Sequence, residues 1–128
     1  MNKKRNVAIL LFDEVEVLDF AGPFEVFSVT GRADNLDPFN VYTVAESLRP
    51  VSARNELSIN PKYSIENCPP PDILLVPGGY GTRREMNNEK LVAWVAETNK
   101  SCELLLSVCT GALILAKAGL LDGLSATT

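Results

Sequence analysis

The chain has 128 residues, of which 46% are hydrophobic and 22% are charged, with 12 Lys and Arg against 16 Asp and Glu. This length suits one hydrophobic core, and the net charge of −4 argues against a nucleic-acid binder that relies on a broad basic face. The chain contains no histidine, which excludes a Ser-His-Asp triad, a Cys-His dyad and a His-based zinc site within these residues.

The cysteines and the N-terminus predict a cytoplasmic protein. Cys68, Cys102 and Cys109 are too few and too scattered for a disulfide scaffold or a four-cysteine metal site. The basic start is followed by a short apolar run that Asp13 and Glu14 interrupt, and no cleavage pattern of a signal peptide follows. No segment reaches the length of a membrane span, so we expect no membrane partner. We also expect no metal, because histidine is absent and the cysteines are scattered, and no organic cofactor.

In chain order, the first half begins with a strand over 7–12, a continuous apolar run of the kind that parallel sheets bury on both faces. Apolar residues at helical spacing then predict a helix that ends at Gly31, with Gly22-Pro23 as its start signal and Asp19 just before it or in its first turn. An alternating segment over 40–45 predicts a more exposed strand, and 51–53 with 57–59 predict a hairpin.

In the second half, buried strands are predicted over 73–76 and 104–108, with a glycine-rich loop over 77–82 between them. Helices are predicted over 88–99 and 112–118. Alternating strands and helices indicate an α/β fold with a mainly parallel sheet. The last βα unit has no closing helix, so we expect that the C-terminal part of the domain is missing from this chain.

Cys109 is the first candidate for chemistry. It lies where a buried strand passes into a helix, the place where open α/β sheets bind ligands, and the helix amides there can stabilise a thiolate. Thr110 adds a hydroxyl and an N–H group, and Gly111 leaves room for approach. The alternative is an inert structural cysteine, which is the interpretation we give to Cys68 and Cys102.

Two further segments reach the same edge of the sheet. The loop from Pro77 to Gly81 offers backbone N–H groups to an oxyanion, although it could also be a plain turn or, less plausibly without a Gly-Lys-Ser/Thr motif, a phosphate loop. Asp19 follows the first strand and could orient the thiol or transfer a proton, or it could be an ordinary acid at a helix start. The convergence of three strand ends predicts one pocket.

Three segments resemble the DJ-1/PfpI (ThiJ) superfamily: FDEVEVLDFAGPFEVF at 12–27, DILLVPGGYGTR at 72–83 and SVCTGALILAKAGLLDGLSATT at 107–128. The most similar branch comprises isonitrile hydratases and the related glutamine-amidotransferase-like domains of AraC-type regulators. The resemblance implies a flavodoxin-like three-layer sandwich, formed here by one domain over 1–128, that usually forms homodimers. It implies Cys109 as nucleophile, Asp19 as its acidic partner, Thr110 as a catalytic and binding residue, and Gly78 and Gly79 in the oxyanion or substrate pocket.

Thr110 stands where protease-like members carry histidine, which weakens an amidase or protease activity and favours the hydratase-like branch. The leading hypothesis is therefore an enzyme that adds water to an isonitrile, a small-molecule substrate, to give an N-substituted formamide. The alternatives are the ligand-sensing domain of a transcription regulator, which would not itself bind nucleic acid, and a glyoxalase-like protein.

Overall fold

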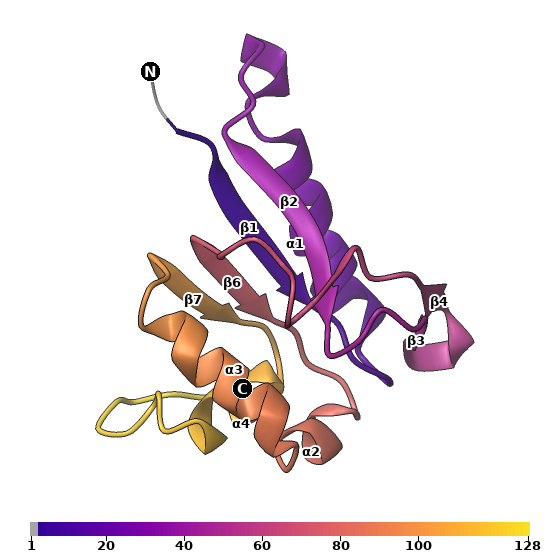
Figure 1. The fold of residues 1–128 in the computed structure, drawn as a ribbon, viewed down its shortest axis with the longest axis vertical. Coiled ribbons are helices and arrows are strands. Elements are labelled where there is room, and N and C mark those ends of the chain that lie inside the picture. Colours follow the sequence, from indigo (N-terminus) through magenta and orange to yellow (C-terminus); the bar gives the residue numbers. More distant parts are fainter. Residues whose placement is uncertain (1–2) are drawn as a thin grey trace.

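The computed structural model describes residues 3–128 and has a five-stranded sheet between two layers of helices (Figure 1). The strands of this sheet are β1 (Arg5–Leu10), β2 (Phe39–Ala45), β5 (Tyr63–Ser64), β6 (Ile73–Val76) and β7 (Leu104–Ser107). A separate antiparallel hairpin is formed by β3 (Val51–Ser52) and β4 (Ser58–Ile59). The helices are α1 (Val17–Val29), α2 (Thr82–Glu85), α3 (Glu89–Asn99) and α4 (Gly111–Lys117), with 3₁₀ turns η1 (Arg32–Asp34) and η2 (Arg54–Glu56).

The sheet order is β5-β2-β1-β6-β7, and every neighbouring pair is parallel. β1 is central, and its residues 7–10 are fully buried because strands flank it on both sides and helices cover both faces. Right-handed crossovers place α1 behind the sheet and α3 in front of it (Figure 1). The predicted α/β sandwich with a mainly parallel sheet is therefore confirmed, as is the hairpin, and the three apolar strands lie side by side in the order β1-β6-β7.

α1 begins earlier than its start signal predicts. The helix already starts at Val17, so Gly22 and Pro23 lie inside it, and the interpretation of Gly22-Pro23 as a helix start is wrong. Proline has no N–H to donate to the carbonyl of Asp19 one turn earlier, which costs the helix a hydrogen bond. Burial of Phe20 against the sheet, with Phe24 packed beside it, offsets this loss, so tertiary packing decides the helix boundary.

α3 agrees closely with its prediction, because its start is encoded locally. The Asn88 side chain caps the helix by accepting a hydrogen bond of 3.3 Å from the Leu91 N–H. β5 and α2 were not predicted, since both are too short to show a period.

β7 differs from its prediction as a buried strand. Leu104 is 48% exposed and Ser107 is also exposed. Within residues 3–128, β6 is the one strand that pairs with β7, so β7 forms an edge of the sheet. The apolar run therefore predicted the strand correctly but not its burial.

Between residues 3 and 128 no helix combines the length and the apolar character that crossing a membrane requires.

Candidate active site

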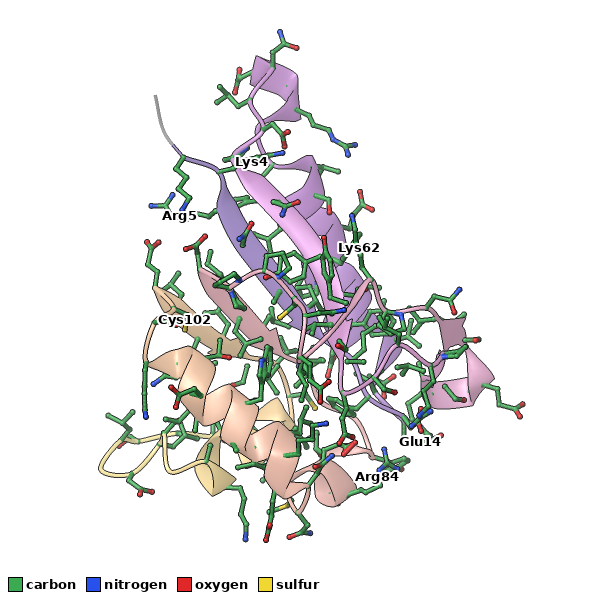
Figure 2. The ribbon with its side chains drawn as sticks, viewed as in Figure 1. Lys4, Arg5, Glu14, Lys62, Arg84 and Cys102 are labelled. Atoms are coloured by element: carbon green, nitrogen blue, oxygen red, sulfur yellow. The ribbon has the colours of Figure 1, made fainter. Side chains whose placement is uncertain are left out.

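Three loops meet at the edge where the parallel strands end. Strands β1, β6 and β7 are neighbours, so the segments that follow them leave the sheet side by side. The Glu16 N–H donates to the Gly78 carbonyl at 2.9 Å, and the Val108 N–H donates to the Val76 carbonyl at 3.1 Å. Figure 2 shows Glu14 and Arg84 at this edge, whereas Arg5 and Cys102 lie where the strands begin.

Cys109 occupies the turn between β7 and α4, where its side chain is exposed. Its φ of 53° is a left-handed value that costs a residue with a side chain about 1–2 kcal/mol, so the surroundings must hold it there. Gly78 permits this turn, because a Cβ at that position would lie 2.6 Å from the Thr110 amide nitrogen and 2.9 Å from the Cys109 Cβ. The β6 loop therefore packs directly against the cysteine turn.

Asp19 lies in the first turn of α1 and reaches the same loops. Its Oδ2 accepts the Gly78 N–H at 3.2 Å, which ties the start of α1 to the β6 loop. The Gly79 N–H donates to the Thr110 hydroxyl at 3.0 Å. Both glycine amides that the sequence suggested as oxyanion donors are thus engaged inside the protein. The Thr110 N–H has no hydrogen-bond partner within residues 3–128, so it is an open donor beside the sulfur.

A pair of threonine hydroxyls, from buried Thr82 and half-buried Thr110, stabilises the loop conformation. Thr82 is fully buried and donates to the Gly79 carbonyl at 2.8 Å, and its oxygen lies 3.1 Å from the Thr110 hydroxyl. Gly79 has a φ of +122°, which residues with side chains rarely adopt. The sequence analysis did not single out Thr82, which no local motif distinguishes.

A cavity of about 280 Å³ opens at Cys109. Its lining comprises Glu16, Arg54, Gly79, Tyr80, Arg83, Cys109 and Thr110. Of the predicted site residues, Gly79, Cys109 and Thr110 line it, while Asp19 and Gly78 lie behind its wall. The sequence analysis missed three further lining residues, Glu16, Arg54 and Arg83. Arg54 could not be found from neighbouring residues, because it comes from the β3–β4 hairpin, which is distant in the chain.

A second cavity, larger than the one at Cys109, lies elsewhere in the molecule. It measures about 520 Å³ between α1 and β2, is lined mostly by apolar residues such as Phe20 and Phe24, and has no cysteine in its wall. The smaller cavity at Cys109 is the better candidate for chemistry because it combines a nucleophile with charged and polar groups. Across residues 3–128, no three His, Cys, Asp or Glu side chains gather as metal ligands would.

The other two cysteines have a different environment. Cys68 and Cys102 are half-buried, and burial raises the pKa of both thiols. Both are therefore less ionised than an ordinary thiol at neutral pH. Their positions agree with a structural role.

Asp13 anchors the hairpin that carries Arg54. Its carboxylate accepts hydrogen bonds from Arg49 Nη2 at 2.8 Å and from the Ser52 N–H at 3.0 Å. The Arg49 guanidinium is the main reason why the pKa of Asp13 lies below its usual value, and the Ser52 bond adds to this effect. The hairpin is thereby fixed over the end of β1.

The DJ-1/PfpI family model matches residues 5–128. The chain is 35% identical to an isonitrile hydratase of Pseudomonas putida over 95% of this chain and 51% of that protein. It is 29% identical to the HTH-type transcriptional regulator GbdR of Pseudomonas aeruginosa, over 93% of this chain and 32% of the regulator. A solved ThiJ/PfpI family protein from Pseudomonas syringae superposes with a TM-score of 0.85 at 32% identity, over 95% of this chain and 49% of the other. The chain thus spans about half of the hydratase and a third of the regulator.

Proposed function

The chain belongs to the DJ-1/PfpI family, and we propose that the protein is a cytoplasmic isonitrile hydratase-like lyase in which Cys109 is the nucleophile. One observation carries the proposal. Cys109 and Thr110 line one cavity, the Thr110 N–H has no hydrogen-bond partner within residues 3–128, and Asp19 is bonded to the loop that carries Gly79 of the cavity wall. A nucleophile, an open hydrogen-bond donor and a carboxyl group are the groups that addition of water to a carbon–nitrogen multiple bond requires.

In the first half of the reaction, Asp19, which does not itself line the cavity, starts as the carboxylic acid and delivers a proton through a water molecule to the terminal isonitrile carbon. The Cys109 thiolate attacks the same carbon, so that a C–S bond forms and the product is a thioimidate, R–N=CH–S. Asp19 is then a carboxylate. In this proposal the Thr110 N–H donates to the substrate and stabilises the charge that develops on it.

In the second half, water adds to the thioimidate carbon. Through the same bridging water, Asp19 accepts one proton from the attacking water and returns it to the nitrogen, which gives a tetrahedral R–NH–CH(OH)–S intermediate. The C–S bond then breaks, the hydroxyl proton returns to Asp19, and the products are R–NH–CHO and the Cys109 thiolate. The sum is one isonitrile and one water giving one formamide, and both protein groups recover their starting forms.

The test follows formamide formation by NMR when full-length protein is incubated with a simple alkyl isonitrile. Cys109→Ala should abolish turnover because the cavity offers no second thiol. Asp19→Asn should reduce the rate about 100-fold or more, since an amide cannot recycle the proton. Cys68→Ala is the matched control and should retain the wild-type rate, because Cys68 lies outside the cavity.

Equal rates for wild type and Cys109→Ala would contradict the proposal, and so would the absence of turnover by the wild-type protein. Loss of activity in the Cys68→Ala control would show that thiol replacement damages the fold rather than the chemistry. Circular dichroism of each variant separates these outcomes.

A ligand-sensing domain is the second candidate function. The observation that favours it is the match of two HTH-type regulators of Pseudomonas aeruginosa, GbdR and CdhR, over 92–93% of this chain at 29–30% identity. Three results together would support the sensor function. The full-length product would contain a helix-turn-helix domain, the Cys109→Ala variant would control transcription as the wild type does, and the protein would not turn over isonitriles.

We further propose that the protein forms a homodimer through the outer face of α1. Leu18, Val26 and Val29 are exposed on this helix and lie within about 80° of one another around its axis. A helix that is apolar on its outer face as well as its inner face is expected to have a partner. Sedimentation of full-length protein tests this, and Val26→Lys should shift the mass towards the monomer. A wild-type monomer at all concentrations would contradict it.

A further inference from the structure

One wall of the Cys109 cavity carries two guanidinium groups around an aromatic ring. The Arg54 guanidinium lies 4.3 Å from the centre of the Tyr80 ring, and that of Arg83 lies 5.9 Å from it. Tyr80 is 63% exposed, and it lines the cavity together with Arg54 and Arg83. We call Arg54, Tyr80 and Arg83 the cationic wall.

The two arginines differ in how their charge is balanced. Arg54 Nη1 lies 2.9 Å from the Glu14 carboxylate, so its charge is compensated within the protein. Arg83 is exposed and forms no ion pair with any residue of the described chain, 3–128. Its guanidinium keeps its donors available for a ligand.

The remaining charged groups around the cavity limit what that ligand can be. Glu16 contributes a carboxylate to the lining, and Asp19 lies behind the wall on the Gly78 N–H. These acids disfavour a dianion such as a phosphate monoester, whereas a planar monoanion matches the one uncompensated guanidinium and can bind it through two parallel hydrogen bonds. The cavity volume of about 280 Å³ suits a small molecule.

We propose that the site selects small substrates that carry a carboxylate at the end opposite the reacting carbon, with Arg83 as the specificity-determining residue. The carboxylate pairs with the Arg83 guanidinium, Tyr80 supports the chain between the two ends, and the reacting carbon reaches Cys109. This inference rests on the proposed function for the identity of the reacting group, but the preference for an anion depends only on the cationic wall.

The first experiment needs no isonitrile. Iodoacetate and iodoacetamide have nearly the same size and alkylate thiols by the same displacement of iodide, but the first carries a carboxylate. Their second-order rate constants at Cys109 are measured on full-length protein by peptide mass spectrometry, and their ratio is compared with the ratio for a free cysteine peptide. We expect the ratio to favour iodoacetate about tenfold over the peptide, and Arg83→Gln to remove this gain.

Arg32→Gln is the matched control, because it removes the same charge at a distance. Arg32 lies in η1, the short purple turn at the top of Figure 1, whereas Arg83 lies in α2 at the bottom. Arg32→Gln should leave the ratio unchanged, which separates a local contact from the effect of net charge. Two results would overturn the inference. The iodoacetate-to-iodoacetamide rate ratio of the wild-type protein could equal that of the peptide, or Arg83→Gln could leave the higher ratio of the wild type unchanged.

The second experiment compares isocyanoacetate with ethyl isonitrile as substrates. The carboxylated isonitrile should have the higher kcat/KM, and Arg83→Gln should raise its KM while kcat stays close to wild type, since Arg83 binds the non-reacting end. Equal turnover of both substrates would overturn the specificity and leave the hydratase activity standing. If neither isonitrile is turned over but Cys109 still reacts preferentially with iodoacetate, the hydratase proposal is wrong and the preference for an anion stands.

Discussion

The substitution Gly78→Ala puts a methyl group into the contact that holds the cysteine turn. The new Cβ would lie 2.6 Å from the Thr110 nitrogen and 2.9 Å from both the Cys109 Cβ and the Thr110 hydroxyl, whereas ordinary contacts begin at 3.4 Å. The turn must therefore retreat by roughly 0.8 Å, since two of these three atoms belong to backbone or Cβ positions that no side-chain rotation can move. Overpacking of this kind costs about 1–3 kcal/mol of unfolding free energy.

Gly78→Ala should affect the rate of reaction at Cys109 more strongly than the free energy of unfolding. A misplacement near 1 Å can reduce a catalysed rate about 100-fold, because nucleophile and donor no longer meet the reacting carbon together. The assays are urea unfolding and the rate of Cys109 alkylation, both on full-length protein, with formamide formation as a third measurement. The alkylation rate reports on the cysteine turn whatever the substrate is.

Gly123→Ala is the matched control for this experiment. Gly123 has a φ of +78° and nothing within 4 Å of the position of its Cβ, so the same chemical change costs about 1 kcal/mol through the backbone alone. Its unfolding free energy should fall while the Cys109 rate stays at the wild-type value. If Gly78→Ala keeps the Cys109 rates within twofold of wild type, the close packing of the β6 loop on the cysteine turn does not position the nucleophile, and the reasoning is refuted.

Three further predictions concern stability, each measured by urea unfolding. Thr82→Val should cost about 0.5–1.5 kcal/mol because it removes the hydrogen bond that the buried hydroxyl donates to the Gly79 carbonyl, which keeps the Thr82 N–H as a donor, and Thr82→Ser should retain most of the stability; equal losses in both would contradict the role of the hydroxyl. Asp13→Asn should cost about 1 kcal/mol or less at pH 7. The Arg49 pair lowers the folded-state pKa of Asp13, so this contribution is present above the unfolded-state pKa near 3.9 and is lost as the pH falls through the lower folded-state pKa. A loss of unfolding free energy in Asp13→Asn that does not shrink as the pH is lowered from 7 would refute this contribution. Pro23→Ala should stabilise the protein by about 1–3 kcal/mol by restoring a helix hydrogen bond, and destabilisation would show that the ring makes packing contacts that outweigh it.

Local patterns in the sequence were enough to predict most of the fold. Continuous apolar runs located β1, β6 and β7, and the apolar spacing over 88–99 located α3 within one residue. The convergence of the segments after these three strands also followed from the sequence, because parallel neighbours end at one edge. Asp19, Gly79, Cys109 and Thr110 could therefore be assigned to one region before any coordinates were known.

Tertiary structure decided the features that depend on contacts between distant segments. Packing of Phe20 and Phe24 on the sheet extends α1 past Pro23, against the local signal. The amides of Gly78 and Gly79 turn inward to Asp19 and Thr110, so that the open donor is Thr110. Neither result can be read from a window of neighbouring residues, because periodicity and propensity describe the chain within one element.

The same distinction explains the composition of the cavity wall. A cysteine, an acid and a glycine-rich loop could be placed at one sheet edge from the sequence, because alternating strands and helices indicate a parallel sheet and the segments that follow its strands leave at the same edge. Only the tertiary structure brings Arg54 from the β3–β4 hairpin beside Tyr80 and Arg83, and places Glu16 rather than Asp19 on the cavity surface. The physical reason is that these contacts join segments separated by many residues, and their geometry depends on how the whole chain packs, whereas the strands and helices depend on residues a few positions apart.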